Sequence, residues 1–285
     1  IGRRTRKPSW LKVRGFGGTE FNRVSGLLKD LELDTVCQEA NCPNRGECFG
    51  RGTAVFLLMG PRCTRNCRFC NVQSGKASPL DPNEPSRVAE ASARLKLRHV
   101  VITSVTRDDL PDGGAAHFAQ TVTAVRAALP RSTIEVLTPD FRGSRDSLAT
   151  VMSARPDVFN HNVETVPRLY ERVRPAADYR PSLGLLRAAS EYRQCLIKSG
   201  LMVGLGETVD EMKQVFGELA AVGVSLLTIG QYLAPSSAHI PIARFVTPEE
   251  FAEYQTIAEH AGIASVFSGP LVRSSYLADR FIPER

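Results

Sequence analysis

One short cysteine-rich stretch, residues 62–71, constrains this chain more than any other part of its sequence. It reads R-C-T-R-N-C-R-F-C-N, in which Cys63, Cys67 and Cys70 have C-x3-C-x2-C spacing. Three arginines place positive charge beside a site that would carry negative charge. Three thiolates hold three irons of a four-iron cluster and leave the fourth iron open. The spacing therefore predicts an iron–sulfur cluster at which chemistry takes place. A structural zinc site or a disulfide pair is the alternative.

A second group of three cysteines lies closer to the N-terminus. Cys37, Cys42 and Cys48 have C-x4-C-x5-C spacing in C-Q-E-A-N-C-P-N-R-G-E-C, whose asparagines, proline and glycine favour repeated turns. The first histidine of the chain is His99, and zinc sites usually use C-x2-C pairs. Three thiolates at this wider spacing favour a second iron–sulfur cluster with a fourth ligand from elsewhere. A zinc-binding or structural loop is the alternative.

Cysteine usage and composition limit the class of protein. Six of the seven cysteines lie between residues 37 and 70, whereas a secreted disulfide framework would spread them more evenly. We therefore expect metal binding in a reducing compartment, the cytoplasm. No apolar run approaches the roughly 18 residues of a membrane-spanning helix, and no signal peptide is visible. The net charge of +6 and the 7% of aromatic residues, without basic–aromatic interleaving, do not favour nucleic-acid binding.

From Ala54 onward, short apolar runs alternate with amphipathic stretches, which predicts an α/β fold. Six such β/α units imply a parallel sheet with right-handed crossovers, closed as a partial TIM barrel. The predicted strands are 55–59, 100–105, 134–137, 158–163, 201–205 and 226–232, with a further strand at 264–267. The predicted helices are 21–33, 85–97, 115–129, 145–153, 166–171, 181–199, 209–222 and 247–260.

This pattern divides the chain into three expected parts. Residues 1–53 form an N-terminal extension with the second cysteine group, residues 54–246 form the barrel, and residues 247–285 form a C-terminal helix and tail. Glycines that follow helix-like stretches are interpreted as helix stops: Gly200, Gly223 and Gly262. Cys195 falls in the amphipathic stretch 181–199 and is interpreted as a buried packing residue of that helix.

Polar residues follow several predicted strands, at the edge of the sheet where such folds carry their chemistry. The segment H-N-V-E-T, which contains Asn162 and Glu164, ends the fourth predicted strand. Arg174, in R-V-R-P, is either a carboxylate clamp or a solvated arginine at a helix end. Near the C-terminus, R-S-S-Y contains Ser274, and a serine oxygen is a weak, exchangeable iron ligand.

Together these motifs resemble those of the lipoyl synthase family of radical S-adenosylmethionine (SAM) enzymes. The resemblance rests on C-x4-C-x5-C, C-x3-C-x-aromatic-C and R-S-S-Y, and also on E-A-N-C-P-N, D-D-L-x-D-G-G-A and H-N-V-E-T-V-P-R-L-Y-x-x-V-R-P. It covers nearly the whole chain. It implies a partial barrel of six β/α units, with N-terminal and C-terminal extensions that carry an auxiliary iron–sulfur cluster.

The resemblance also implies roles for individual residues. The catalytic, SAM-cleaving [4Fe–4S] cluster would be bound by Cys63, Cys67 and Cys70. The auxiliary [4Fe–4S] cluster would be bound by Cys37, Cys42, Cys48 and Ser274. Ser275 is the alternative to Ser274 as the fourth ligand, because the two serine hydroxyls have the same chemistry toward iron. The candidates for holding the ribose and methionine parts of SAM are Asn162, Glu164 and Arg174.

The implied reaction is a sulfurtransferase step of lipoate biosynthesis. Two sulfur atoms are inserted at C6 and C8 of an octanoyl chain, whose carbons carry no acidic proton, so a radical is required. The auxiliary cluster is the implied sulfur donor. The octanoyl group is expected on a lipoyl carrier domain, of a 2-oxoacid dehydrogenase E2 subunit or the glycine-cleavage H protein, and ferredoxin or flavodoxin is the expected kind of electron donor. The basic segment 3–14, with six Lys and Arg residues, is expected to help dock the carrier.

Three other functions are compatible with parts of the sequence. A biotin-synthase-like or methylthiotransferase-like enzyme would share the C-x3-C-x2-C stretch, but C-x4-C-x5-C and R-S-S-Y argue against it. A zinc-stabilised basic module for nucleic acids would not need six β/α units. A ferredoxin-like electron carrier would hold clusters without cleaving SAM.

Overall fold

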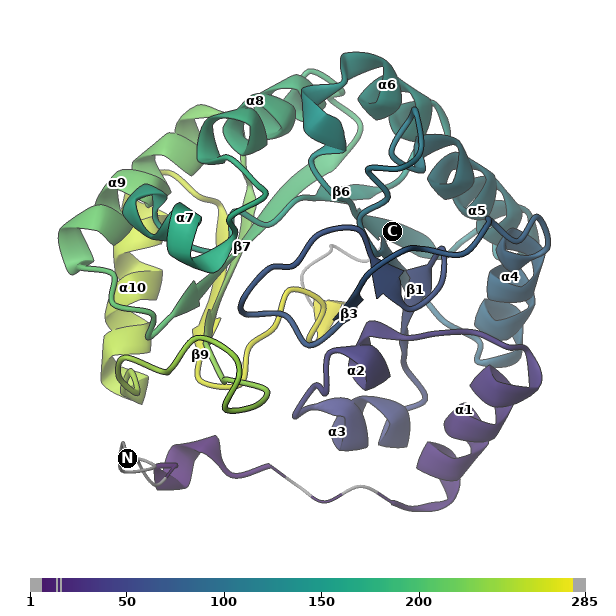
Figure 1. Ribbon diagram of the computed structural model, residues 1–285, viewed down its shortest axis with the longest axis horizontal. Coiled ribbons are helices and arrows are strands. Elements are labelled where there is room, and N and C mark those ends of the chain that lie inside the picture. The colour runs from purple at the N-terminus through teal and green to yellow at the C-terminus, as the bar shows by residue number, and fades with distance from the viewer. Residues whose placement is uncertain (1–6, 14, 16, 279–285) are drawn as a thin grey trace.

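The computed structural model describes residues 7–13, 15 and 17–278. Within this part of the chain, an entirely parallel seven-stranded sheet curves into an incomplete barrel (Figure 1). Its strands lie in chain order: β1 (Val55–Leu58), β4 (His99–Ser104), β5 (Thr133–Leu137), β6 (Val158–Asn160), β7 (Leu196–Val203), β8 (Leu226–Gln231) and β9 (Ser265–Gly269). The predicted partial barrel is confirmed, and the further strand is present as β9.

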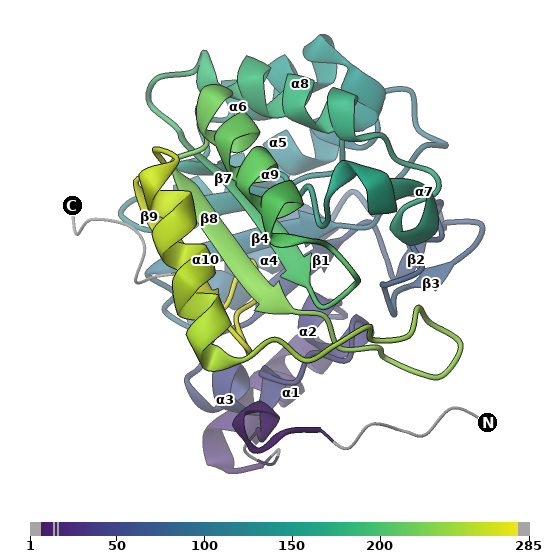
Figure 2. The same cartoon turned by 90° about the vertical axis from the view of Figure 1, so that its left-hand side faces the viewer.

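Helices between the strands cover the outside of the barrel, and Figure 2 shows α9 and α10 lying over its last strands. They are α4 (Glu84–Arg94), α5 (Ala115–Ala128), α6 (Arg145–Ser153), α8 (Tyr179–Ser190), α9 (Val209–Ala221) and α10 (Pro248–His260). Alternate strand residues such as Val100 and Ile102 belong to the hydrophobic core beneath these helices. Among the described residues, no helix combines the length and apolar character that crossing a membrane requires.

The remaining elements lie outside this alternation of strands and helices, and the N-terminal helices among them lie beside the open side of the barrel, between β1 and β9 (Figure 1). They include α1 (Thr19–Asp30), α2 (Val36–Glu39), α3 (Arg45–Gly50), the paired β2 (Arg62–Cys63) and β3 (Gln73–Ser74), α7 (Tyr170–Val173), and the 3-10 helices η1 (Ser9–Leu11), η2 (Phe141–Gly143) and η3 (Pro167–Leu169). Thr35 forms an antiparallel bridge with Phe56, so the chain before α2 covers the free edge of β1.

The structure corrects the prediction for residues 181–205. The helix ends at Ser190, and β7 already begins at Leu196. Cys195 therefore lies in the turn before β7 and not in a helix, although it packs against the core as expected. Gly200 is not a helix stop but lies inside β7, where a Cβ atom would stand 2.6 Å from Asn162 Oδ1. Gly223 and Gly262 end α9 and α10 as predicted, with φ angles of 88° and 102°.

A buried ion pair inside the barrel accounts for this error. Lys198 Nζ on β7 lies 2.8 Å from Glu135 Oε1 on β5, and each side chain is 1% exposed. His99 Nε2 on β4 lies 3.2 Å from the other oxygen of the same carboxylate. A lysine within an apolar stretch of sequence indicates the polar face of an amphipathic helix, unless its ion-pair partner is known. That partner cannot be recognised when it is distant in the sequence. Here the partner lies on another strand, so the lysine faces the lumen.

This ion pair gives a stability prediction. Burial acts to raise the pKa of the Glu135 carboxyl, but Lys198 and His99 outweigh that effect and bring it to about 2. Glu135→Gln leaves the Lys198 ammonium buried without this carboxylate, and breaking such a pair costs about 3–5 kcal/mol of unfolding free energy. We expect a lower thermal midpoint for the anaerobic protein, partly restored by adding Lys198→Met. An unchanged midpoint would contradict this account.

The pH dependence of stability follows from the same shift. The pKa of Glu135 is lower in the folded chain than its ordinary value of 4.5. The contribution of the ionised carboxylate is therefore fully present above pH 4.5 and is lost as the pH falls toward about 2. The difference in thermal midpoint between the wild type and Glu135→Gln should shrink across that range.

Candidate active site

The loop with C-x3-C-x2-C spacing follows β1 and is fastened to the loop after β4. The backbone N–H of Thr64 donates to Thr106 O at 3.0 Å, and the Thr64 hydroxyl accepts from the Asp108 N–H at 3.0 Å. The sulfur of Cys63 accepts N–H groups from Arg65 at 3.4 Å and from Thr106 at 3.3 Å. These two contacts fix the position of the Cys63 sulfur relative to the loop after β4.

Arg65 clamps this loop onto two neighbouring strands. Its guanidinium bonds both oxygens of Asp108, at 2.7 and 2.9 Å, and both oxygens of Asp140, at 2.6 and 2.7 Å. Burial acts to raise the pKa of Asp140, but Arg65 outweighs it and brings the pKa to about 2. The cysteine loop is therefore fixed over the carboxyl ends of β4 and β5. The sequence contains these residues, but nothing in their spacing indicates that they meet.

Cys67 and Cys70 lie in the same surroundings as two of the predicted SAM contacts. Burial raises the pKa of the Cys67 thiol, and the nearby Arg174 guanidinium opposes this shift. Burial raises the pKa of Cys70 to about 12, to which the charges of Cys67, Cys63 and Glu164 add. Buried thiols lose their protons when they bind a cation, so this donor set fits an iron cluster.

Asn162, Glu164 and Arg174 gather beside the cysteine loop. Glu164 has a φ of 66°, and its carboxylate accepts from Asn162 Nδ2 at 3.1 Å. Burial raises the pKa of Glu164, and Arg174 opposes the shift. Arg174 is 8% exposed and donates to Asn162 O at 3.0 Å, so the solvated alternative for this arginine is wrong. Its role as a carboxylate clamp stays a prediction.

Several buried polar atoms at this edge of the sheet have no hydrogen-bond partner within the described residues. They are Ser104 Oγ, Arg107 Nη1, Thr138 Oγ1, Asn162 Oδ1 and Arg174 Nε. An unpaired buried polar group costs about 1–3 kcal/mol, so such a gathering is typical of a ligand site. Donors and acceptors of both kinds suit a ligand with amino, carboxylate and hydroxyl groups, as SAM has.

The second cysteine group is built by α2 and α3. Cys37 lies on α2, Cys48 on α3 and Cys42 in the turn between them. Burial raises the pKa of both the Cys37 and the Cys48 thiol to about 12, and Cys42 adds to each shift. Asn71 Nδ2 donates to Glu39 O at 2.8 Å, so the two cysteine loops touch. The structure thus brings together what the two motifs predicted separately.

The C-terminal tail reaches this second group. Asn44 Nδ2 donates to Leu271 O at 2.7 Å, and the Tyr276 hydroxyl lies 3.1 Å from the Glu47 carboxylate. Ser274 Oγ lies 2.7 Å from Asn162 Nδ2, on the side of the barrel. Ser275 instead lines a pocket with Cys37 and Cys48. Of the two serines, Ser275 therefore shares a pocket with the group, and Ser274 as its fourth ligand stays a prediction.

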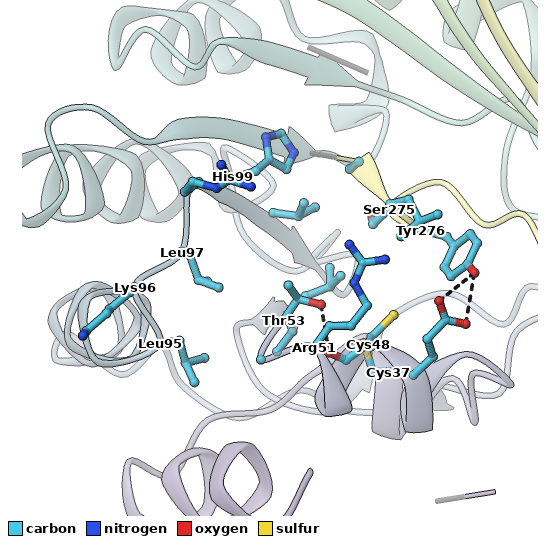
Figure 3. Close-up of a pocket in the computed structure, with 18 residues that line it drawn as sticks. Cys37, Cys48, Arg51, Thr53, Leu95, Lys96, Leu97, His99, Ser275 and Tyr276 are labelled. Atoms are coloured by element: carbon cyan, nitrogen blue, oxygen red, sulfur yellow. Dashed lines mark hydrogen bonds between the residues drawn. The ribbon is translucent and has the colours of Figure 1, made fainter. Parts of the chain in front are cut away.

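That pocket is an opening of about 220 Å³ beside the second cysteine group (Figure 3). Cys37 and Cys48 lie on one side of it, His99 on another, and Tyr276 at the tail, with its bond to Glu47 drawn dashed. Its charged lining residues are Arg51, Lys96, Arg98 and Glu47, so positive charge exceeds negative charge around it. No motif in the sequence indicated this pocket. Its lining includes cysteines of both α2 and α3.

Among the described residues, no three His, Cys, Asp or Glu side chains converge as ligands of one metal ion do. A cluster of four irons and four sulfides is wider than a single ion, so its thiolates stand farther apart. The seven cysteines are free thiols. The disulfide alternative for the first group is therefore wrong.

Comparison with known proteins decides the family. Residues 1–42 match the family model for the N-terminal domain of lipoyl synthase, and residues 57–219 match the radical SAM superfamily model. The lipoyl synthase of Caldanaerobacter subterraneus subsp. tengcongensis is 58% identical over 275 residues, which cover 96% of each chain. The chain belongs to the lipoyl synthase family. A second lipoyl synthase, from Oleidesulfovibrio alaskensis, is 54% identical over 98% of this chain and 96% of its own.

Solved structures support the barrel. Methylornithine synthase matches with a TM-score of 0.50 and 14% identity over 89% of this chain and 83% of its own. HydG, a maturase of the [FeFe]-hydrogenase, matches with a TM-score of 0.59 and 15% identity over 73% of this chain and 50% of its own. At these identities the likeness concerns the fold alone.

Membership of the lipoyl synthase family rules out the other functions considered from the sequence. It makes this protein a radical SAM enzyme that inserts sulfur, with a [4Fe–4S] cluster and SAM. The biotin-synthase-like, methylthiotransferase-like, nucleic-acid-binding and electron-carrier interpretations are therefore wrong. The division at residues 53 and 246 stays a prediction. Part of the basic segment 3–14, namely Arg3, Arg4, Arg6 and Arg14, lies outside the described residues.

Proposed function

We propose that this lipoyl synthase inserts two sulfur atoms, at C6 and C8 of an octanoyl chain carried by a lysine of a lipoyl domain. In this proposal, the SAM-cleaving cluster is bound by Cys63, Cys67 and Cys70. The auxiliary [4Fe–4S] cluster, which donates the sulfur, is bound by Cys37, Cys42, Cys48 and Ser274.

The observation that carries this proposal is the convergence of both cysteine groups on one polar space. Ser274 reaches Asn162 beside the first group, while Asn44 ties the same tail to the second group. The Arg273 guanidinium lies close enough to interact with both the Cys42 thiol and the Glu164 carboxylate. A radical formed near one group could therefore reach sulfur held by the other.

The protein's own residues bind, orient and shield the reactants. When bound, the open-iron cluster and SAM supply the radical that removes hydrogen from an unactivated carbon. Arg174 and Glu164 are suited to the carboxylate and amino groups of SAM, and Asn162 Oδ1 to a ribose hydroxyl. All three lie within or beside the barrel, where exclusion of water protects a radical and fixed dipoles orient the ligand.

The proposed partners follow from the reaction. They are an octanoylated lipoyl carrier domain, of a 2-oxoacid dehydrogenase E2 subunit or the glycine-cleavage H protein, and an electron donor such as ferredoxin or flavodoxin. We place the enzyme in the cytoplasm, because its thiols need a reducing compartment. Nucleic acids and membranes are not among the proposed partners.

The decisive test is anaerobic incubation with SAM, a reductant and an octanoylated carrier peptide, followed by mass spectrometry. The expected product is the peptide carrying two added sulfur atoms, formed together with 5′-deoxyadenosine. A peptide that stays octanoylated while SAM is cleaved would contradict the substrate, and a peptide with a single methylthio group would contradict the reaction.

Salt should weaken binding of the carrier if the basic segment docks it. Lys7 and Lys12 are exposed, and attraction between exposed charges is screened over about 8 Å at physiological salt. We expect Lys7→Glu with Lys12→Glu to raise the Kd of the carrier at low salt, and less so at high salt. Lys213→Glu, at an exposed lysine on α9, is the matched control. Equal affinities for the wild type and the first variant would exclude this docking role.

A further inference from the structure

Asn162 stands between the two cysteine groups and contacts a residue on each side. Its Nδ2 atom lies 3.1 Å from Glu164 Oε1 and 2.7 Å from Ser274 Oγ. Asn162 follows β6, whereas Ser274 lies 112 residues later in the tail. This contact therefore joins the SAM side of the barrel directly to the predicted fourth ligand of the auxiliary cluster.

The neighbours of Asn162 determine which way its amide faces. Carboxylate oxygens accept hydrogen bonds, so the nitrogen and not the oxygen faces Glu164. The two hydrogens of Nδ2 are enough to serve both contacts, which makes Ser274 Oγ an acceptor. Asn162 Oδ1 lies against Gly200, where a Cβ atom would be 2.6 Å away. Arg174 donates to the Asn162 backbone oxygen at 3.0 Å, and this contact holds the backbone that carries the Asn162 amide.

The backbone around Ser274 is fixed by other contacts. Val272 O lies so close to β8 that a Cβ atom on Gly230 would clash with it. Asn44 holds the neighbouring Leu271 O at 2.7 Å. Loss of the Asn162 amide should therefore free the Ser274 side chain without releasing the tail.

We propose that Asn162 is a positioning residue that presents Ser274 Oγ to the auxiliary cluster and ties this oxygen to the SAM side of the site through Glu164. This inference rests on the proposed function, in which Ser274 is the fourth ligand. The hydrogen bond occupies one lone pair, selects one side-chain rotamer and leaves the other lone pair for iron. Partners that orient metal ligands in this way are worth about 10–100-fold in metal affinity or activity.

The test isolates the auxiliary iron in the whole chain. In a Cys63→Ala, Cys67→Ala, Cys70→Ala background, anaerobically prepared protein is mixed with a ferrous chelator, and the rate of loss of the first iron is measured. Asn162→Leu and Ser274→Ala should each speed this loss about tenfold or more, and the double variant should be no faster than Ser274→Ala alone. The matched control is Asn83→Leu, because Asn83 is exposed before α4 and its side chain makes no capping bond there. It should keep the background rate.

A cysteine at position 274 separates positioning from a general structural effect. A thiolate is a better matched ligand for iron than a serine oxygen and does not need the Asn162 donor. In a Ser274→Cys background, Asn162→Leu should no longer change the rate. Continued acceleration there would overturn the proposal, because the asparagine would then act on the whole loop.

The remaining outcomes distinguish failure of this inference from failure of the proposed function. If Ser274→Ala loses iron fast but Asn162→Leu loses it at the background rate, the positioning role of Asn162 is wrong. Ser274 would still be the fourth ligand. A normal rate in Ser274→Ala, or fast loss only in Ser275→Ala, would overturn both the ligand and the positioning role. A background chain that binds no iron would overturn the auxiliary cluster itself.

Discussion

Cys67→Ala is expected to abolish the formation of 5′-deoxyadenosine from SAM. The first cysteine group offers three thiols, so loss of one leaves too few ligands to hold a cluster with a single open iron. Partners that merely orient metal ligands cost about 10–100-fold when removed, so removal of a ligand should cost more than about 100-fold. The measurement is 5′-deoxyadenosine released anaerobically with SAM and reductant.

Cys195→Ala is the matched control for this experiment. Cys195 is also a partly buried cysteine, but it lies in the turn before β7 and belongs to neither group. It should keep both SAM cleavage and full iron content. If Cys67→Ala cleaved SAM as fast as the wild type, the assignment of the first cysteine group to SAM would be wrong.

Features with a short-range cause could be predicted from the sequence. The helix at 145–153 has the predicted bounds, and α10 agrees with the predicted helix at 247–260 and begins at a Thr247–Glu250 capping box. The two cysteine groups were recognisable because the cysteines of each group lie within a few residues of one another. In each case the residues that cause the structure are neighbours in the chain, so one stretch of sequence contains the whole signal.

Features that depend on distant partners could not be predicted. Lys198 looks like the polar face of a helix until Glu135 is placed opposite it, and the boundary of β7 was misplaced for that reason. Gly200 resembles a helix stop because its real constraint, the approach of Asn162, comes from another strand. The tail's approach to Asn162 likewise joins segments 112 residues apart. Each of these contacts exists only once the barrel has formed.

Cys42→Ala is expected to leave SAM cleavage measurable and to stop formation of the lipoyl product. The side chain of Cys42 is lost, but its backbone contacts are not: its N–H donates to Cys37 O at 3.2 Å, and its carbonyl accepts from the Arg45 N–H at 3.2 Å. The turn between α2 and α3 should therefore persist, and Asn71 keeps its contact with Glu39 O, so the first cysteine loop stays supported.

The informative quantity is the ratio of lipoyl product to 5′-deoxyadenosine in the same reaction. If the second group donates sulfur, this ratio should fall to zero in Cys42→Ala. Hydrogen would still be removed from the octanoyl chain, but the variant would hold no auxiliary cluster to donate sulfur. In Cys67→Ala both quantities should vanish together, so the two variants separate the two cysteine groups. Lipoyl product from Cys42→Ala at the wild-type ratio would show that sulfur reaches the chain from elsewhere. The cysteines of α2 and α3 would then have a structural role, and the assignment of Ser274 as the fourth ligand of a sulfur-donating cluster would be wrong.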